Sequence, residues 1–189
     1  MKVIPFLNNE KQLIRRACEG SAMAQERLFK KHAPKMLSVC RQYIPELQRA
    51  EEAMCNGFLK VFKNLKSYRG EGSFEGWVRR IMVRESISYL RSDDKMYFKD
   101  LTETTAISEF NTMETSLEVQ DIQHMIDELP PGYRSVFVLY AIEGYKHQEI
   151  AEILSISEST SKTQLFKARK KLQENLIEIN RYHNGTHEI

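Results

Sequence analysis

The chain has 189 residues, of which 41% are hydrophobic and 29% charged, and its formal net charge at pH 7 is +2. It can therefore fold into one large or two small domains, and its longest apolar run, residues 136–142, is too short to span a membrane. The cysteines Cys18, Cys40 and Cys55 form no CxxC pair, which disfavours a zinc framework and predicts buried, reduced thiols. The N-terminal stretch MKVIPFLNNEK lacks the apolar core of a secretion signal, so we expect a cytoplasmic protein.

Charge is unevenly distributed along the chain. Residues 92–128 contain ten acidic residues and only two lysines, a balance of −8, so the rest of the chain carries +10. This segregation predicts two basic bodies joined by an acidic connector. Basic bodies favour polyanions, and neutralisation of phosphates is the commonest source of nucleic-acid affinity.

Apolar residues recur at helical spacing through most of the chain, and no alternating strand pattern persists. In chain order this periodicity predicts helices over residues 10–19, 21–32, 34–43, 48–65, 73–91 and 117–128, and then a helix that begins at Pro131 and ends at Gly144. We expect an all-α protein with a helical domain over 10–91, a flexible acidic linker over 92–116, a second helical domain over 117–178 and a flexible tail over 179–189.

The stretch EIAEILSISESTSKTQLFKARKKL, residues 149–172, has the pattern of a helix-turn-helix. Ile150, Ile153 and Leu154 give the first helix an apolar face, and Ser157 is a plausible N-cap for the second. Ser161, Leu165, Ala168 and Leu172 share one face of that second helix, and we expect the last three to pack inward.

The other faces of this second helix mix cations with residues that suit base edges. They carry Lys162, Thr163, Phe166, Lys167 and Lys170, and this combination favours insertion into the major groove of duplex DNA. The alternative is an ordinary helical hairpin whose charged face is solvated.

A second informative stretch, KSYRGEGSFEGWVRRIMVRESISYLR, covers residues 66–91. It combines a glycine-rich loop at 66–72 with aromatic residues and, after the loop, four arginines, which suits stacking on unpaired bases and contacts to their backbone. We expect Phe74 to belong to the core, whereas core and exposed positions are equally open for Trp77.

These motifs together resemble the sigma factors of bacterial RNA polymerase, in the extracytoplasmic-function (ECF) group. SFEGWVRRI resembles the promoter-melting segment of that family, AEEAMCNGFLKVFKNLKSYRGEGSF resembles the preceding segment that binds core polymerase, and residues 129–172 resemble its fourth-region domain. The resemblance runs from about Leu13 to Leu176. It implies a non-enzymatic promoter-specificity subunit, without cofactor or metal, that binds core RNA polymerase and promoter DNA.

The resemblance also assigns roles to residues. It implies that the minus-35 element is read by Lys162, Thr163, Phe166 and Lys167, with Arg169 and Lys170 on the DNA backbone. It implies that the minus-10 element is read and opened by Tyr68, Arg69, Trp77, Arg79, Arg80 and Arg84, and that core polymerase docks on Glu51, Glu52 and Phe58. Members of this group are usually inhibited by an anti-sigma factor, often membrane-anchored.

The sequence departs from the family pattern at several positions. Ser155 stands where glycine is usual, and Ser161 stands where Val or Ile is usual. Arg84 and Ser88 replace the common Asn and Asp of the melting segment, and residues 55–57, Cys-Asn-Gly, replace a common acidic or amide pair.

Two other classes of function remain as alternatives. The first is a stand-alone helix-turn-helix regulator that binds duplex operators, but the short, mixed tail IEINRYHNGTHEI offers no dimerisation segment. The second is an enzyme such as a nuclease or metal-dependent hydrolase. It is disfavoured because the five histidines, His32, His124, His147, His183 and His187, are scattered, and no HExxH, phosphate loop or serine elbow is present.

Overall fold

The computed structural model describes residues 6–92 and 119–185, with side chains over 10–92 and 121–177. These residues are helical, with no strand among them, and they form two compact units that divide between Ser92 and Asp93. The expected all-α class with two helical domains is confirmed. The expected linker, beyond Ser92 itself, lies outside the described residues.

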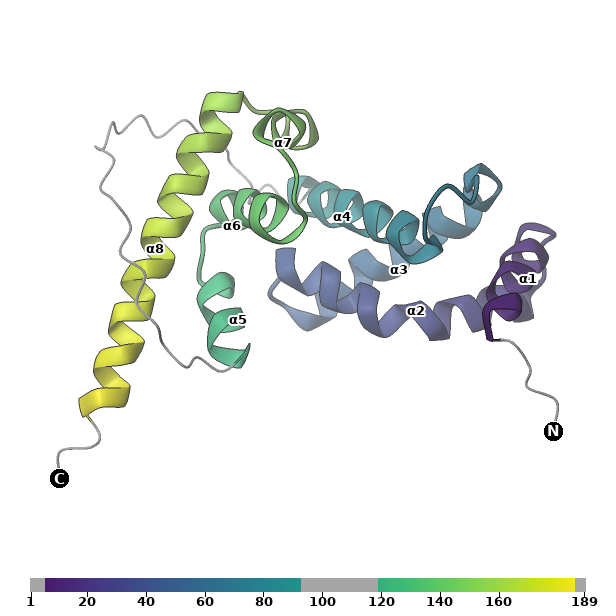
Figure 1. Cartoon of the computed structure of the whole chain (residues 1–189), viewed down its shortest axis with the longest axis horizontal. Coiled ribbons are helices and arrows are strands. Elements are labelled where there is room, and N and C mark those ends of the chain that lie inside the picture. Colours follow the sequence, from purple (N-terminus) through teal and green to yellow (C-terminus); the bar gives the residue numbers. More distant parts are fainter. Residues whose placement is uncertain (1–5, 93–118, 186–189) are drawn as a thin grey trace. The chain divides into compact units, whose positions relative to one another are not determined.

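The N-terminal unit contains α1 (Phe6–Cys18), α2 (Ala22–Tyr43), α3 (Leu47–Lys63), a 3-10 turn η1 (Leu65–Ser67) and α4 (Phe74–Ser92). Helices α2, α3 and α4 pack against one another, and α1 packs on α2 and η1 (Figure 1). Their shared core includes fully buried Leu28, Met36, Val61 and Met82. Burial of these side chains, rather than helix propensity alone, stabilises the unit.

Helix α2 is continuous where the sequence predicts a break at Pro34. A proline inside a helix removes one backbone hydrogen bond, here to the carbonyl of Lys30. Pro34 lies on the exposed side of α2, where water can bond that carbonyl, and the flanking Leu28 and Met36 are both buried. The apolar face on either side of Pro34 therefore holds the two segments in one helix.

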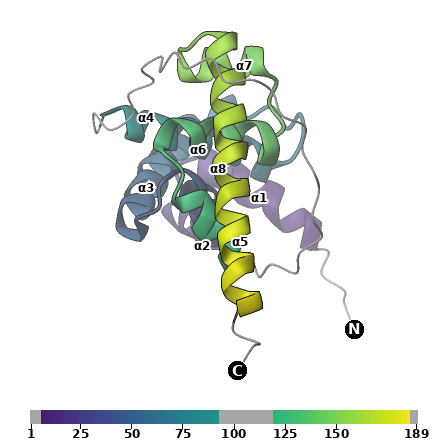
Figure 2. The same cartoon turned by 90° about the vertical axis from the view of Figure 1, so that its left-hand side faces the viewer.

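The C-terminal unit contains α5 (Val119–Asp127), α6 (Pro131–Phe137), a π-helical turn η2 (Val138–Ile142), α7 (His147–Leu154) and α8 (Glu158–Gly185). Helices α5, α6 and α7 all contact α8, the long yellow helix in Figures 1 and 2. Helix α8 continues to Gly185, so the segment over 179–189 that was expected to be a tail is helical up to that residue.

A buried arginine organises the junction between α5 and α6. The Arg134 guanidinium is 5% exposed and donates hydrogen bonds to the carbonyls of Ile126 at 3.1 Å, Asp127 at 2.7 Å and Leu129 at 2.7 Å. These carbonyls lie at and just beyond the C-terminal end of α5, where helical carbonyls lack partners and the helix dipole favours a cation. No local pattern around Arg134 indicates this role, because its partners are carbonyls of the preceding helix end.

Candidate nucleic-acid interfaces

The turn between α7 and α8 has the geometry of a helix-turn-helix. Ser155 follows α7 in the left-handed conformation, with φ 54° and ψ 47°, and the Ile156 amide donates to the Ala151 carbonyl at 3.0 Å. A left-handed residue is the usual way to end a helix, and glycine adopts it at least cost. Ser155 therefore keeps the shape of the turn at some cost in strain.

Hydroxyl groups cap the first turn of α8. The Thr160 amide donates to Ser157 Oγ at 3.0 Å, and that oxygen also lies 2.8 Å from Ser159 Oγ and 2.7 Å from Thr160 Oγ1. Ser157 is thus the expected N-cap of the second helix. Glu158 adds a carboxylate at the positive end of the helix dipole.

Helix α8 has a buried face and an exposed face, and most of its residues lie on the face that the sequence predicts. Leu165 and Ala168 are buried, whereas Leu172 is half-buried. Of the residues expected on the DNA-facing side, Lys162, Thr163 and Lys170 are exposed, and Phe166 and Lys167 are half-buried. Arg169 is also exposed.

Two of these exposed side chains already have partners within α8. Lys162 Nζ lies 2.7 Å from Glu158 Oε1, and this ion pair lowers the pKa of the Glu158 carboxyl. Thr163 Oγ1 donates to the Ser159 carbonyl at 3.0 Å and can still accept a hydrogen bond. Both contacts are solvent-exposed, so Lys162 can exchange its carboxylate for a phosphate or a base edge at little cost.

A hydrogen bond between His147 of α7 and Ser161 of α8 joins the two helices on the buried side of α8. His147 Nδ1 lies 2.9 Å from Oγ of Ser161, which is fully buried, and the His147 ring stacks on Tyr140 with centroids 4.7 Å apart. Burial, and then the nearby Lys162 ammonium, lower the pKa of His147. The sequence shows Ser161 as a departure from an apolar position, but only the structure identifies the histidine that satisfies its hydroxyl.

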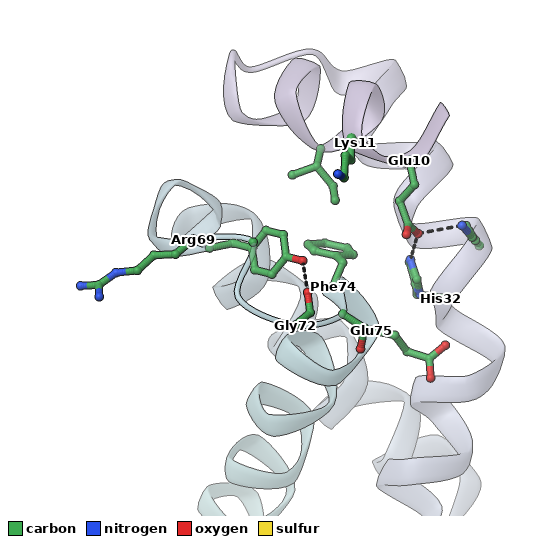
Figure 3. A pocket seen from close by; sticks show the side chains of 12 residues that line it. Glu10, Lys11, His32, Arg69, Gly72, Phe74 and Glu75 are labelled. Carbon is green, nitrogen blue, oxygen red and sulfur yellow. Dashed lines mark hydrogen bonds and ion pairs between the residues drawn. The ribbon is translucent and has the colours of Figure 1, made fainter. Parts of the chain in front are cut away.

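In the N-terminal unit, a cavity of about 620 Å³ opens between α1, α2 and the loop before α4 (Figure 3). Tyr68, Arg69, Gly70, Gly72 and Ser73 line it from the loop side. The Tyr68 hydroxyl donates to the Gly72 carbonyl at 2.8 Å and closes the loop on itself. The Arg69 side chain is exposed and extends away from the cavity.

The opposite wall of the cavity comes from α1 and α2, whose residues lie far from this loop in the sequence and were not predicted to meet it. Glu10 Oε1 lies 2.7 Å from Lys31 Nζ and 3.0 Å from Nε2 of buried His32. Partial burial is the largest single influence and raises the pKa of the Glu10 carboxyl. The contacts with Lys31 and His32 together outweigh it, so this pKa lies below its ordinary value. The cavity therefore combines a carboxylate, cations and an aromatic surface.

Three aromatic rings form a cluster beside this cavity. Phe74 is buried, as expected, and its ring centroid lies 5.3 Å from that of Tyr68 and 5.8 Å from that of Trp77. Trp77 is half-buried and also contacts Tyr68, with centroids 5.5 Å apart. The loop and α4 thus bring Tyr68 and Trp77 together, with part of the Trp77 surface still exposed.

The arginines expected in the minus-10 contact lie along α4 rather than in the cavity. Arg80 and Arg84 are exposed, and Arg79 is half-buried. None of these three residues lines the cavity. Their arrangement along one helix suits an extended phosphate backbone better than a single enclosed group.

The expected docking residues of α3 fall into two groups. Glu51 and Glu52 are exposed, but Phe58 is only 3% exposed, and its ring packs on Phe29 at 4.7 Å and on Phe62 at 6.0 Å between centroids. Phe58 is therefore a core residue and cannot make a direct docking contact in this structure. The neighbouring Leu59 is 68% exposed and occupies the outer face.

The structure also shows the surroundings of Gly57 and of the three cysteines. A Cβ atom added at Gly57 would overlap the Met82 sulfur, so glycine leaves room for this side chain of α4 against α3. Cys40 is buried, and burial raises the pKa of its thiol to about 11. Cys18 is half-buried and Cys55 is exposed, so the expectation of three buried thiols is wrong for these two; all three are free cysteines.

Within the described residues, the structure holds no group of three His, Cys, Asp or Glu side chains arranged to bind a metal ion. None of the described helices combines the length and the apolar character needed to cross a bilayer.

Comparison with known proteins assigns the two units to one family. A model described as Sigma-70 region 2 matches residues 28–96, and one described as Sigma-70, region 4 matches residues 119–172. The matched ranges together span nearly two thirds of the chain, one in each unit. Helix α1, which forms one wall of the cavity, precedes the matched range.

Full-length relatives agree with this assignment. The RNA polymerase sigma-H factor of Pseudomonas aeruginosa is 22% identical over 183 residues, covering 88% of this chain and 93% of the relative. The ECF RNA polymerase sigma-E factor of Escherichia coli K12 is 25% identical over 171 residues, covering 84% of this chain and 89% of the relative. This chain belongs to the sigma-70 family of RNA polymerase sigma factors, in its ECF group.

A solved structure shows the same fold. It is that of the sigma factor RpoE from Bartonella quintana, in complex with the anti-sigma factor NepR. The TM-score is 0.52 with 19% sequence identity, over 80% of this chain and 95% of that chain.

Proposed function

We propose that the two units of this sigma factor divide promoter recognition between them. The helix-turn-helix reads the minus-35 element in duplex DNA, and the cavity loop with α4 reads and opens the minus-10 element. The proposal rests on the presence of two different binding surfaces in one chain. The C-terminal unit has a helix-turn-helix whose second helix exposes cations. The N-terminal unit has a cavity with aromatic walls beside a helix that carries arginines.

In the minus-35 contact, Lys162, Thr163, Phe166 and Lys167 face the bases, while Arg169 and Lys170 hold the phosphate backbone. Lysine can donate to guanine O6 and N7, threonine offers a hydroxyl, and phenylalanine suits a thymine methyl group. The caps at Ser157 and the buried Leu165 and Ala168 support this role, because they fix the helix that presents these side chains.

In the minus-10 contact, the loop over 66–72 holds a base that leaves the stack. Unstacking costs a few kcal/mol per base, which contacts in the cavity must offset. Tyr68 and Trp77 supply aromatic surface, and Arg79, Arg80 and Arg84 follow the backbone of the opened strand. Because Arg69 points away from the cavity, we assign it to a phosphate rather than to the base.

Core polymerase docks on the exposed face of α3. Glu51 and Glu52 supply the carboxylates, and Leu59 takes the apolar role that the sequence suggests for Phe58. The protein performs no chemistry of its own in this proposal, because phosphodiester synthesis belongs to the polymerase. It acts with the polymerase and the chromosome in the cytoplasm.

Transcription by core polymerase, with and without this protein, tests the proposal on a library of promoters. We expect specific initiation only when the protein is present, and we expect Lys162→Ala to reduce initiation at promoters that depend on the minus-35 element. Equal transcript yields with and without the protein, across the promoter library, would overturn the proposal. Tight, specific gel shifts by the free protein, without polymerase, would favour the stand-alone regulator instead.

An anti-sigma factor is the expected regulator, as in the complex of the Bartonella sigma factor with NepR. We propose that such a partner covers both DNA-binding faces. Co-purification followed by transcription assays tests this, and full promoter activity within a stable complex would contradict it.

A further inference from the structure

The docking face of α3 is tied to α4 by two polar contacts. The Tyr89 hydroxyl on α4 donates to Glu52 Oε2 on α3 at 2.8 Å. Two turns further along α3, Lys60 forms an ion pair with Glu85 of α4, whose side chain is nearly buried. Between these contacts, Gly57 lets the Met82 side chain of α4 approach the α3 backbone. The two helices therefore present their outer side chains in a fixed register.

Tyr89 is itself held in place. The Arg49 guanidinium lies over its ring, with Cζ 5.4 Å from the centroid, and Arg49 Nη1 lies 3.1 Å from Glu46 Oε2. The Tyr89 side chain is half-buried, whereas Glu52 is exposed. A restrained phenol thus bonds a carboxylate that would otherwise sample several rotamers in water.

Restraint of this kind matters for docking more than for folding. A solvent-exposed hydrogen bond adds little to the stability of the fold, because water replaces it when it is lost. A long side chain that becomes immobilised in an interface loses rotamer entropy, and a side chain already fixed in its bound position avoids that loss. The contact between Tyr89 and Glu52 therefore suits the preparation of a binding group.

We propose that Tyr89 is a positioning residue for polymerase docking: its hydroxyl fixes the Glu52 carboxylate and links the docking helix to the helix that carries Arg79, Arg80 and Arg84. The inference rests on the proposed docking role of Glu52. It deepens that role, because Tyr89 acts through Glu52 and makes no contact of its own with the polymerase.

The experiment is a double-mutant cycle on the affinity of the full-length protein for core polymerase, with Tyr89→Phe, Glu52→Gln and the double variant. Tyr89→Phe keeps the ring under Arg49 and removes the hydroxyl, together with its hydrogen bonds to Glu52 and to Arg49. We expect it to weaken binding about fivefold, and Glu52→Gln about tenfold, at unchanged melting temperature. The double variant should match Glu52→Gln alone. The control Ser38→Ala, which removes an exposed hydroxyl bonded to the Pro34 carbonyl in the same unit, should bind like wild type.

Each outcome has a distinct meaning when only the folded, monomeric fraction is assayed. Failure of the wild-type protein to bind core polymerase would defeat the proposed function as a whole. Wild-type affinity in Glu52→Gln would remove Glu52 from the docking site and overturn this inference with it. If Glu52→Gln weakens binding but Tyr89→Phe does not, the docking site stands and the role of Tyr89 is wrong. Additive losses in the double variant would mean that Tyr89 contacts the polymerase directly, which also overturns the inference.

Discussion

The neighbours Phe58 and Leu59 on α3 should respond in opposite ways to truncation. Phe58 is 3% exposed and contacts two other phenylalanine rings, whereas Leu59 is 68% exposed. Truncation of a buried phenylalanine to alanine costs about 3–5 kcal/mol, a large share of the 5–15 kcal/mol that stabilises a typical domain. We therefore expect Phe58→Ala to lower the melting temperature of the N-terminal unit by more than about 10 °C.

Leu59→Ala should leave that melting temperature nearly unchanged, because surface truncations usually alter stability by less than about 0.5 kcal/mol. It should instead weaken the affinity for core polymerase by at least about fivefold, the loss expected for a residue that contributes more than 1 kcal/mol to an interface. Differential scanning calorimetry and a polymerase-binding assay on both variants measure these effects. A wild-type melting temperature in Phe58→Ala, together with a loss of polymerase binding, would show that Phe58 serves docking and not the core.

The C-terminal unit yields further predictions. Ser155→Gly should stabilise it by about 1 kcal/mol, since glycine adopts the left-handed conformation without strain, and a lower melting temperature would contradict this reading of the turn. Arg134→Met leaves three carbonyls without their donor and should destabilise the unit by about 3 kcal/mol or more in urea unfolding, whereas the exposed-site control Arg169→Met should cost far less. Because His147 has a lowered pKa in the folded state, the unfolded state binds its proton more readily. The stability that His147 contributes is therefore present above its ordinary pKa of about 6.5 and is lost as the pH falls below it. Unfolding curves between pH 8 and 5 check this, and His147→Asn should flatten the dependence; an identical pH profile in the variant would rule His147 out as its source.

Local pattern determined most of the secondary structure, because each helix signals itself through spacing and caps within a few residues. The turn at Ser155, the cap at Ser157 and the inward Leu165 and Ala168 are all local features, and they were predicted from the sequence. The break expected at Pro34 was wrong, because burial on both sides of the proline outweighed the lost hydrogen bond. Local propensity is weak compared with tertiary packing.

The amino-acid sequence by itself determined the class of this protein: two helical units, a helix-turn-helix in the second and an aromatic, arginine-rich segment in the first. The expectation of two basic bodies is wrong for the second, since the excess of positive charge lies in residues 1–92. The spacing of Ala50, Met54 and Phe58 already places Phe58 on the apolar face of α3, and its docking role came from the family resemblance alone. The packed helices show the outcome: Phe58 lies against Phe29, and Leu59 is exposed.

Only the tertiary structure decided which groups meet. The pairs Glu10 with His32 and Tyr89 with Glu52 are separated by 22 and 37 residues, and such contacts depend on how the helices pack rather than on any local pattern.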